Sequence, residues 1–326
     1  MPKTKLLVIC PKDHSALRYL GPLVDVAEIG ISDDQAELER QAPGAEVILL
    51  ITVSGTAVNW PSVWQQARSV RWVHALFTGV ENILFPALID SDVPLTNARG
   101  VFKRALAEFA VLGILFHTKK LRQLIDNQRQ RKWADFSVTF ANQRIMGVIG
   151  FVEIGRECAF LAKGLGLTIH AFRRNPDRSA DDPVADRIFG PTQLHEMLGG
   201  IDFLLCAAPL TPETHHMMSD AEFNVMKPTA IVMNVGRGPV IDESALVRAL
   251  RNQRIAGASL DVFEREPLPV ESPLWEMENV LISPHNTDRT TDPDWVELSV
   301  RMFIANFQRY RNREPLENVV DKKAGY

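Results

Sequence analysis

The sequence predicts an α/β protein made of two Rossmann-like domains with parallel sheets. Two observations carry this expectation. From residue 5 onward, short apolar runs typical of buried strands alternate with amphipathic runs typical of helices. At 326 residues the chain is also too long for one core of ordinary size and fits two domains.

The N-terminal part contains three strand candidates with a helix among them. The apolar runs 5–10 (KLLVIC), 45–51 (AEVILLI) and 71–77 (RWVHALF) predict strands, and 60–67 (WPSVWQQA) predicts a helix. A long helical run follows at 103–133, apolar nearly all round at first and basic later. We therefore expect one long helix that links the domains, with its first half buried and its second half emerging.

The central part predicts a doubly wound parallel sheet. Apolar runs with helical segments between them follow one another along the chain. The strand candidates are 145–150, 167–172, 202–208, 230–236, 256–263 and 280–285. The tail, 294–316, is a further amphipathic helix that we expect to return to the first domain.

Composition indicates small-molecule chemistry. With 46% apolar residues, 23% charged residues and a formal net charge of -4, no strong field favours nucleic acid or an acidic membrane surface. Cys10, Cys158 and Cys206 are far apart in apolar runs, which suits reduced, buried thiols better than disulfides or a metal site. MPKT leads directly into a strand-like run, and no apolar run reaches membrane-spanning length, so a cytoplasmic protein is expected.

The segment 146–155 (MGVIGFVEIG) resembles a strand that enters a glycine-rich phosphate loop. Gly150 and Gly155 hold the outer positions of the Gly-x-Gly-x-x-Gly pattern, and Val152 stands where the middle glycine is expected. A branched Val occupies space that a pyrophosphate would approach, and it does not readily adopt positive φ. The segment is either a loosened nucleotide loop or an ordinary strand-to-helix turn.

Two arginines end the next strand candidate. Arg173 and Arg174 lie roughly 20 residues beyond the loop, where an acidic side chain would bind the ribose hydroxyls of NAD. Guanidinium groups suit a 2′-phosphate instead, so NADP is favoured and NAD is the second candidate. The other interpretation is a solvated basic turn, RRNPDR at 173–178.

Three residues that could carry chemistry each follow a strand candidate, at the edge where open α/β sheets bind ligands. They are Arg237 in NVGRGPVID, Glu266 in LDVFEREPLP and His285 in LISPHNTD. Each alone is more often structural than catalytic.

Together with TGV at 78–80, TNARG at 96–100, LAEFA at 106–110 and APLTPET at 208–214, these words resemble the D-isomer-specific 2-hydroxyacid dehydrogenase family over nearly the full chain. The resemblance is greatest to its NADPH-dependent glyoxylate and hydroxypyruvate reductases. It implies a substrate domain of residues 1–99 and 288–326 and a dinucleotide-binding domain of residues 100–287. It also implies a homodimer through the dinucleotide-binding domain, and the apolar first half of the long helix would suit such an interface. In some relatives an aromatic near the position of Trp133 reaches across the dimer into the partner's site, whereas here we expect an ordinary packed or exposed Trp133.

The resemblance further implies reduction of small 2-oxo acids to D-2-hydroxy acids. Arg237 would bind the carboxylate and polarise the carbonyl, His285 would donate the proton, and Glu266 would raise the pKa of His285. Gly79 and Val80 would bind the other end of the carboxylate through backbone N–H groups. The expected cofactor contacts are Gly150, Val152, Glu153, Ile154, Gly155, Arg173, Arg174, Pro209, Thr214, Val235, Gly236 and Asp261, with Asp261 on the nicotinamide carboxamide.

Other functions stay open at this point. Formate dehydrogenases carry Gln where Glu266 stands, which argues against formate as the substrate. A nucleotide-sensing, corepressor-like binding protein is one alternative, and a family member whose cofactor site is weakened by Val152 is another.

Overall fold

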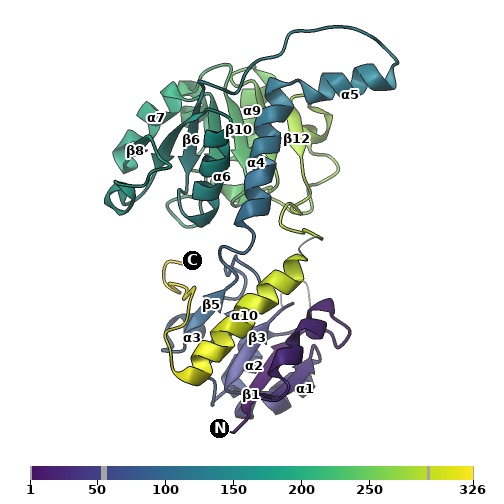
Figure 1. Cartoon of the computed structure of the whole chain (residues 1–326), viewed down its shortest axis with the longest axis vertical. Coiled ribbons are helices and arrows are strands. Elements are labelled where there is room, and N and C mark those ends of the chain that lie inside the picture. Colours follow the sequence, from purple (N-terminus) through teal and green to yellow (C-terminus); the bar gives the residue numbers. More distant parts are fainter. Residues whose placement is uncertain (1, 53–56, 292–293, 326) are drawn as a thin grey trace. The chain divides into compact units, whose positions relative to one another are not determined.

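The computed structural model describes residues 2–52, 57–291 and 294–325 and divides the chain into two compact units (Figure 1). Unit 1 comprises Met1–Val101 and Thr290–Tyr326, and unit 2 comprises Phe102–Arg289. The middle of the chain therefore forms one unit and its two ends form the other. Each unit contains one parallel sheet covered by helices, so the predicted fold class is confirmed.

Unit 1 contains a five-stranded parallel sheet in the order β2-β1-β3-β4-β5. Three predicted strands are present, and β2 and β5 were not predicted. The strands are β1 (Thr4–Ile9), β2 (Ala27–Ser32), β3 (Val47–Leu50), β4 (Trp72–Ala75) and β5 (Leu95–Asn97). The helices are η1 (Ser15–Leu23), α1 (Gln35–Gln41), η2 (Ala42–Gly44), α2 (Trp60–Gln66), α3 (Pro86–Ile89) and α10 (Trp295–Asn312).

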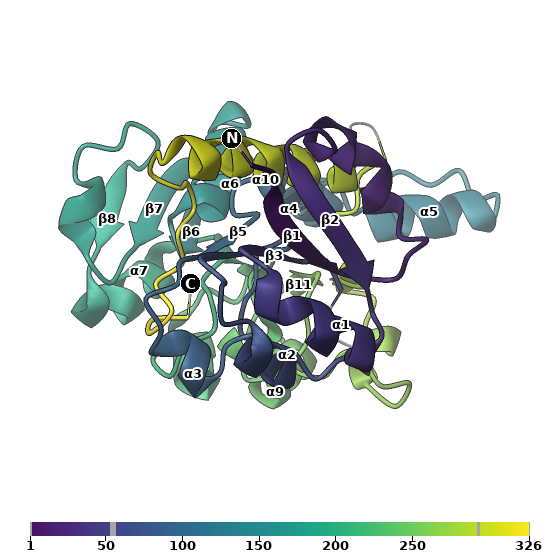
Figure 2. The same ribbon diagram turned by 90° about the horizontal axis from the view of Figure 1, so that it is seen from below.

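Both faces of this sheet are buried, as a parallel sheet requires. Alternate residues of β1 supply the two faces: Leu7 and Ile9 pack with α1, α2 and α3, whereas Leu6 and Val8 pack with η1 and α10. Figure 2 shows α1 and α2 on one side of β1 and β3 and α10 on the other. The tail helix thus belongs to the core of unit 1, which is where we expected it.

Unit 2 contains a seven-stranded parallel sheet in the order β12-β11-β10-β9-β6-β7-β8. The order reverses between β6 and β9, which is the doubly wound pattern whose switch point binds ligands. All six predicted strands are present, and β8 is additional. The strands are β6 (Ile145–Ile149), β7 (Thr168–Phe172), β8 (Arg187–Phe189), β9 (Phe203–Cys206), β10 (Ile231–Asn234), β11 (Gly257–Leu260) and β12 (Val280–Ile282).

Helices cover both faces of this sheet. On one face α4 (Lys103–Thr118) packs beside α6 (Glu153–Gly164), and on the other lie α7 (Leu194–Gly200), α8 (Asp220–Val225) and α9 (Glu243–Arg251) (Figure 1). Short 3-10 turns η3 (Pro176–Ser179), η4 (Pro191–Gln193), η5 (Gly238–Val240) and η6 (Pro273–Glu276) connect these elements. Local sequence explains α9: Asp242 caps its N-terminus by accepting the Ala245 N–H, and Arg248 and Arg251 stand in its last turn.

The prediction of one helix over 103–133 is wrong in one respect. Lys120 adopts the left-handed conformation, with φ 50°, and separates α4 from α5 (Leu121–Arg129). No Gly or Pro marks this break, so the helical pattern runs through it. The expected difference between the halves is confirmed, because α4 contributes eight buried residues and α5 contributes none.

The cysteines fit the prediction of buried, reduced thiols. Cys10, Cys158 and Cys206 are all buried and free. Burial raises the pKa of Cys10 and of Cys206 to about 12.

Candidate active site

The glycine-rich loop joins β6 to α6 at the switch point of unit 2. Gly150 has φ +86°, and a Cβ there would lie 2.5 Å from the backbone nitrogen of Ala208. A Cβ on Gly155 would collide with the carbonyl oxygen of Gly150. Both glycines are therefore required by the turn, the first for its conformation and the second for close packing of helix against strand.

Val152 is the N-cap residue of α6 and has φ −121° and ψ −154°. The turn therefore does not require positive φ at this position, and Val152 lies in extended backbone that any residue adopts. Its N–H donates to the Gly150 carbonyl at 2.8 Å, and its side chain is 42% exposed. The steric half of the argument, that the side chain hinders a pyrophosphate, stays a prediction.

Helix α6 begins at the loop and presents its N-terminus there. Glu153, Ile154 and Gly155 form its first turn, and the N–H of Arg156 is the first to return to the Val152 carbonyl, at 2.7 Å. The N–H groups that precede it in a helix have no intrahelical acceptor, and the helix dipole favours an anion at that end.

The two predicted arginines lie at the end of β7. The Arg173 guanidinium bonds the hydroxyl of Ser179, which is buried, and the Arg173 N–H donates to the Phe189 carbonyl at 3.0 Å. Arg174 is exposed. The Thr211 hydroxyl and, to a smaller extent, the charge of Arg174 lower the pKa of Glu213.

A third arginine joins this cluster and was missed from the sequence. Arg156, in the first turns of α6, donates to Asp182 at 2.7 Å. Burial opposes ionisation of Asp182, but the bond from Arg156, the Val184 N–H and the charge of Arg173 hold its pKa below the ordinary value. Arg156 and Asp182 are 26 residues apart, so no local pattern could have paired them.

The loops after β9 and β10 pack closely. Thr214 folds its own loop by donating to the Pro209 carbonyl at 2.7 Å. Val235 and Gly236 are buried, and a Cβ on Gly236 would lie 2.7 Å from the Ala208 carbonyl oxygen. These four predicted residues therefore line the same edge of the sheet as the glycine loop, since the strands that precede them are adjacent and parallel.

Arg237 follows β10, and Asn234 holds the backbone around it. The buried Asn234 donates to the Arg237 carbonyl at 3.0 Å and accepts the Gly236 N–H at 3.0 Å. The Arg237 guanidinium donates to the Gly236 carbonyl at 2.8 Å and is half-buried. Its charge acts on both Glu266 and His285, so the structure brings the three predicted residues together.

Glu266 and His285 form a direct pair. The Nδ1 of His285 lies 2.6 Å from Oε2 of Glu266, whose Oε1 accepts the Phe263 N–H at 3.0 Å. The bond to Glu266 raises the pKa of His285 against the effect of burial. Burial opposes ionisation of Glu266, but the bond from His285 and the Phe263 N–H lower its pKa. The pair therefore favours an imidazolium held by a carboxylate.

Asp261, expected to contact the nicotinamide, is 2% exposed and accepts hydrogen bonds from the segment that carries His285. The hydroxyls of Ser283 and Thr287 each donate to it at 2.6 Å, and the Asn286 N–H donates at 3.2 Å. Ser283 and Thr287 were not among the predicted site residues. A hydroxyl on either side of a candidate catalytic His is a signal that could have found them.

Gly79 and Val80 lie in unit 1, after β4. Val80 is buried, and its carbonyl accepts the N–H groups of Ile83 and Leu84. Asn97 donates to the Thr78 carbonyl at 2.6 Å and so fixes the start of this turn.

Trp133 is fully exposed, at 104% of its reference area, in the segment after α5. Figure 1 shows α5 and the segment that follows it extending from the rest of unit 2 as an arm. We define the arm as residues 119–143. Its exposed apolar side chains are Leu124, Ile125, Trp133, Val138 and Phe140.

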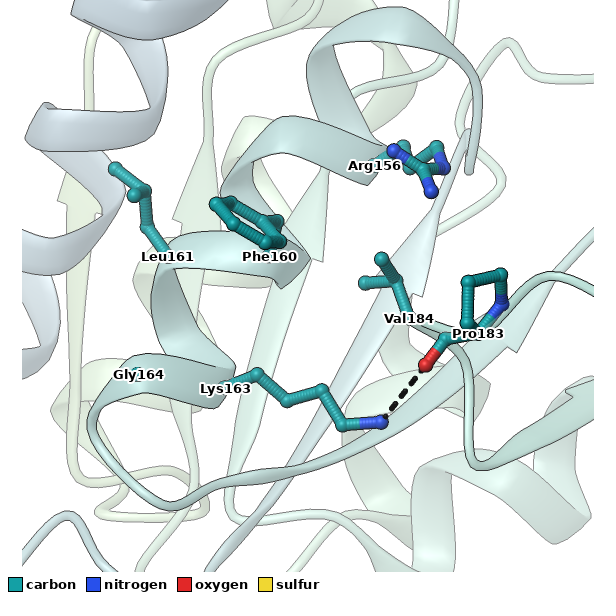
Figure 3. A pocket seen from close by; sticks show the side chains of 7 residues that line it. All are labelled: Arg156, Phe160, Leu161, Lys163, Gly164, Pro183 and Val184. Carbon is teal, nitrogen blue, oxygen red and sulfur yellow. Dashed lines mark hydrogen bonds between the residues drawn. The ribbon is translucent and has the colours of Figure 1, made fainter.

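An open groove of about 460 Å³ lies between α6 and the segment with Pro183 and Val184 (Figure 3). Phe160 and Leu161 supply apolar surface, and Lys163 spans the groove by donating to the Pro183 carbonyl at 3.2 Å. Of the predicted cofactor and catalytic residues, none lines this groove.

Within residues 2–52, 57–291 and 294–325, no cluster of His, Cys, Asp and Glu side chains is arranged to hold a metal ion. Across the same residues, the helices are too short or too polar to span a membrane.

The fold and this site define a doubly wound dinucleotide-fold protein with an Arg, a Glu and a His at the carboxyl edge of its sheet. Residues 111–287 match the family described as D-isomer specific 2-hydroxyacid dehydrogenase, NAD binding domain. The chain belongs to this family and is a 2-hydroxyacid dehydrogenase.

The chain is similar in sequence to known reductases over most of its length. It is 31% identical to a glyoxylate reductase of Thermococcus gammatolerans over 310 residues, covering 91% of this chain and 90% of that protein. It is 31% identical to glyoxylate/hydroxypyruvate reductase B of Yersinia enterocolitica over 261 residues, covering 78% of each.

The chain is also similar in structure to solved proteins. An NADPH-dependent glyoxylate/hydroxypyruvate reductase of Sinorhizobium meliloti, in complex with NADP and sulfate, superposes with a TM-score of 0.84 at 27% identity, covering 99% of this chain and 100% of that one. A probable 2-hydroxyacid dehydrogenase of Rhizobium etli, in complex with NADP, gives a TM-score of 0.84 at 27% identity and covers 100% of both chains.

Proposed function

We propose that this protein is an NADPH-dependent reductase of small 2-oxo acids, of the glyoxylate and hydroxypyruvate type, and that it forms D-2-hydroxy acids. The observation that carries the proposal is the 2.6 Å pair of His285 and Glu266 beside the charge of Arg237. This set supplies a proton donor and a cation, the two groups that carbonyl reduction requires from the protein.

Arg237 binds the substrate in this proposal. Its guanidinium is a fixed cation that forms bidentate bonds with a carboxylate. Because Asn234 holds the Arg237 carbonyl and the guanidinium itself donates to the Gly236 carbonyl, the guanidinium has a restricted range of positions. Its charge then polarises the adjacent carbonyl of the 2-oxo acid.

His285 donates the proton. Its Nδ1 is engaged by Glu266, which leaves Nε2 to face the ketone oxygen. Glu266 keeps the imidazole protonated until the transfer and stabilises its orientation. Glu in place of the Gln of formate dehydrogenases fits a reaction in which a proton moves.

The residues present fit a dinucleotide. The turn at Gly150 has no room for a Cβ, and the N-terminus of α6 offers N–H groups to the pyrophosphate. Arg173 and Arg174 would bind the 2′-phosphate of NADP, and Glu153, Ile154, Gly155, Pro209, Thr214, Val235 and Gly236 would line the rest of the site. When bound, the cofactor supplies the hydride. NAD is the second candidate because the family as a whole is described as NAD-binding.

We assign dinucleotide binding to one part of the chain and substrate binding to the other. Residues 100–287 bind the dinucleotide, and residues 1–99 with 288–326 form the substrate domain, whose Gly79 and Val80 N–H groups bind the substrate carboxylate. Gly79→Pro removes one of these donors. It should raise the KM for the 2-oxo acid and leave the Kd for NADPH unchanged.

We also propose a homodimer and a cytoplasmic location. The exposed apolar side chains of the arm support the homodimer, because exposed clusters of this kind mark interaction sites. Sedimentation equilibrium should give twice the chain mass, and Trp133→Ser with Phe140→Ser should weaken the dimer. The three free, buried cysteines support the cytoplasmic location, which cell fractionation tests.

The activity is tested with purified protein, NADPH and either glyoxylate or hydroxypyruvate, by following the loss of nicotinamide absorbance. Turnover with either substrate supports the proposal. Tight NADPH binding without turnover on any small 2-oxo acid would favour the corepressor-like alternative, and absence of NADPH binding would favour a cofactor site weakened by Val152.

A further inference from the structure

Three donors from one short segment converge on the buried carboxylate of Asp261. Ser283 and Asn286 bond Oδ1, at 2.6 and 3.2 Å, and Thr287 bonds Oδ2 at 2.6 Å. All three donors belong to the segment 283–287, which follows β12 and carries His285. The two hydroxyl bonds are the shorter ones, at 2.6 Å each.

Asp261 itself is held rigidly. Its N–H donates to the Asn234 carbonyl at 3.0 Å, and the Ser283 N–H donates to the Leu260 carbonyl at 2.9 Å. These bonds continue the parallel ladders of β10, β11 and β12 past the ends of the strands. The carboxylate is therefore a fixed point to which the segment is tied.

His285 lies between the two tied hydroxyls in the chain. Its φ is 50°, in the left-handed region that is uncommon for residues other than glycine. A non-glycine residue persists in that conformation where the surrounding structure holds it. Ser283 holds the chain before His285, and Thr287 holds it after.

We propose that Ser283 and Thr287, acting through Asp261, are positioning residues that aim His285 at Glu266 and at the substrate. The proposal rests on the proposed function of His285 as proton donor. The hydroxyls do not touch the reacting atoms. They set the direction of the imidazole, and a small misdirection of a proton donor is costly to the rate.

The carboxamide contact expected for Asp261 is compatible with this role but separable from it. Each carboxylate oxygen accepts about two hydrogen bonds, so one acceptor position remains on Oδ2. Substitution of Asp261 would disturb both roles at once. Substitution of Thr287 removes only the tie to the segment, and it is therefore the informative change.

The test compares Thr287→Val, Thr287→Ser and Ser283→Ala with the wild type, and Thr118→Val is the matched control. Thr118 is a buried threonine in α4 whose hydroxyl bonds the Ile114 carbonyl, far from this segment in sequence. Three quantities are measured: kcat and KM for the 2-oxo acid, the Kd for NADPH, and the pKa of His285 by NMR of histidine-labelled protein, assigned with His285→Gln.

Thr287→Val should lower kcat about tenfold or more, by misplacing the donor, and change the Kd for NADPH less than about twofold. Its His285 pKa should fall towards the ordinary value, because the bond to Glu266 is weakened. The charges that bear on His285 in this titration are Glu266, Asp261, Arg237 and Asp288. Thr287→Ser, which keeps the hydroxyl, should restore both readings, and Thr118→Val should change neither.

Wild-type kcat together with an unchanged His285 titration in Thr287→Val would overturn the proposal. If Thr287→Val does not fold, Ser283→Ala removes the other hydroxyl from the same carboxylate and is judged by the same readings. The NMR titration needs no turnover. A wild type that reduces no 2-oxo acid would therefore refute the proposed function, while the titration would still decide whether the hydroxyls position His285.

Discussion

His285 and Glu266 lie 19 residues apart in the chain, and their side chains meet at 2.6 Å between Nδ1 and Oε2. The hydrogen bond to Glu266 is the largest cause of the raised pKa of His285. Because the proposed reduction uses the protonated imidazole, activity should be retained at low pH and fall as the pH rises through this raised value.

Glu266→Gln tests this relationship through the pH profile of reduction. Loss of the anionic partner lowers the pKa of His285, so the fall in kcat should move to lower pH. His285→Ala should lower kcat by about 10²-fold or more and leave the Kd for NADPH nearly unchanged. A profile that does not move in Glu266→Gln would mean that Glu266 has only a structural role.

The cofactor preference is tested by Arg173→Asp combined with Arg174→Ala. The wild type should prefer NADPH to NADH in kcat/KM, and the double variant should lose the preference. Each lost charged hydrogen bond weakens NADPH binding by about 1.5 to 3 kcal/mol. The control is Arg248→Ala, which removes an exposed arginine of α9 that pairs with Asp220. Equal use of both cofactors by the wild type would contradict the assignment of these arginines.

Val152→Gly tests the effect of the unusual side chain in the glycine loop. Since Val152 already has negative φ, the change relieves no backbone strain and isolates the steric effect. It should lower the Kd for NADPH and raise kcat/KM without altering the preferred 2-oxo acid. Val152→Ala should act in the same direction and less strongly. Equal or weaker NADPH affinity in both variants would show that the side chain does not hinder the cofactor.

Much of the fold could be predicted because parallel strands buried on both faces appear as continuous apolar runs. The strands β2, β5 and β8 were missed because they are short or incompletely buried. β8 has three residues with one buried, β5 has three residues, and β2 lies at a sheet edge with a mixed burial pattern. The break at Lys120 was missed because a lysine in the left-handed conformation leaves no mark in the sequence.

The features of the site also divide into those that a sequence pattern predicts and those that depend on tertiary contacts. The proximity of Arg237, Glu266 and His285 could be predicted because each lies in a segment that follows a strand of one parallel sheet, and such segments meet at one edge. The pairs Arg156 with Asp182 and Thr287 with Asp261 depend on tertiary contacts across 26 residues each. The conformation at Val152 depends on how the turn packs, which no residue pattern encodes.

Acid stability of unit 1 is tested through His74, a fully buried imidazole beside Trp72 and Thr96. Burial lowers its pKa to about 3, and the unfolded value is about 6.5. Between these values the unfolded state binds a proton that the folded state does not, so the free energy of unfolding falls as the pH falls below about 6.5.

His74→Phe removes this proton uptake. The loss of unfolding free energy between pH 7 and pH 5, followed by tryptophan fluorescence, should shrink by about 2 kcal/mol. A pH dependence in His74→Phe equal to that of the wild type would show that His74 is not the group that titrates on unfolding.

The most direct test of the proposed reductase activity is the rate of NADPH oxidation by the wild type with glyoxylate and with hydroxypyruvate, measured beside His285→Ala at matched NADPH saturation. We expect turnover by the wild type, a D-2-hydroxy acid as product, and a loss of about 10²-fold or more in the variant. Equal rates in the two proteins, or no oxidation by a wild type that binds NADPH, would contradict it.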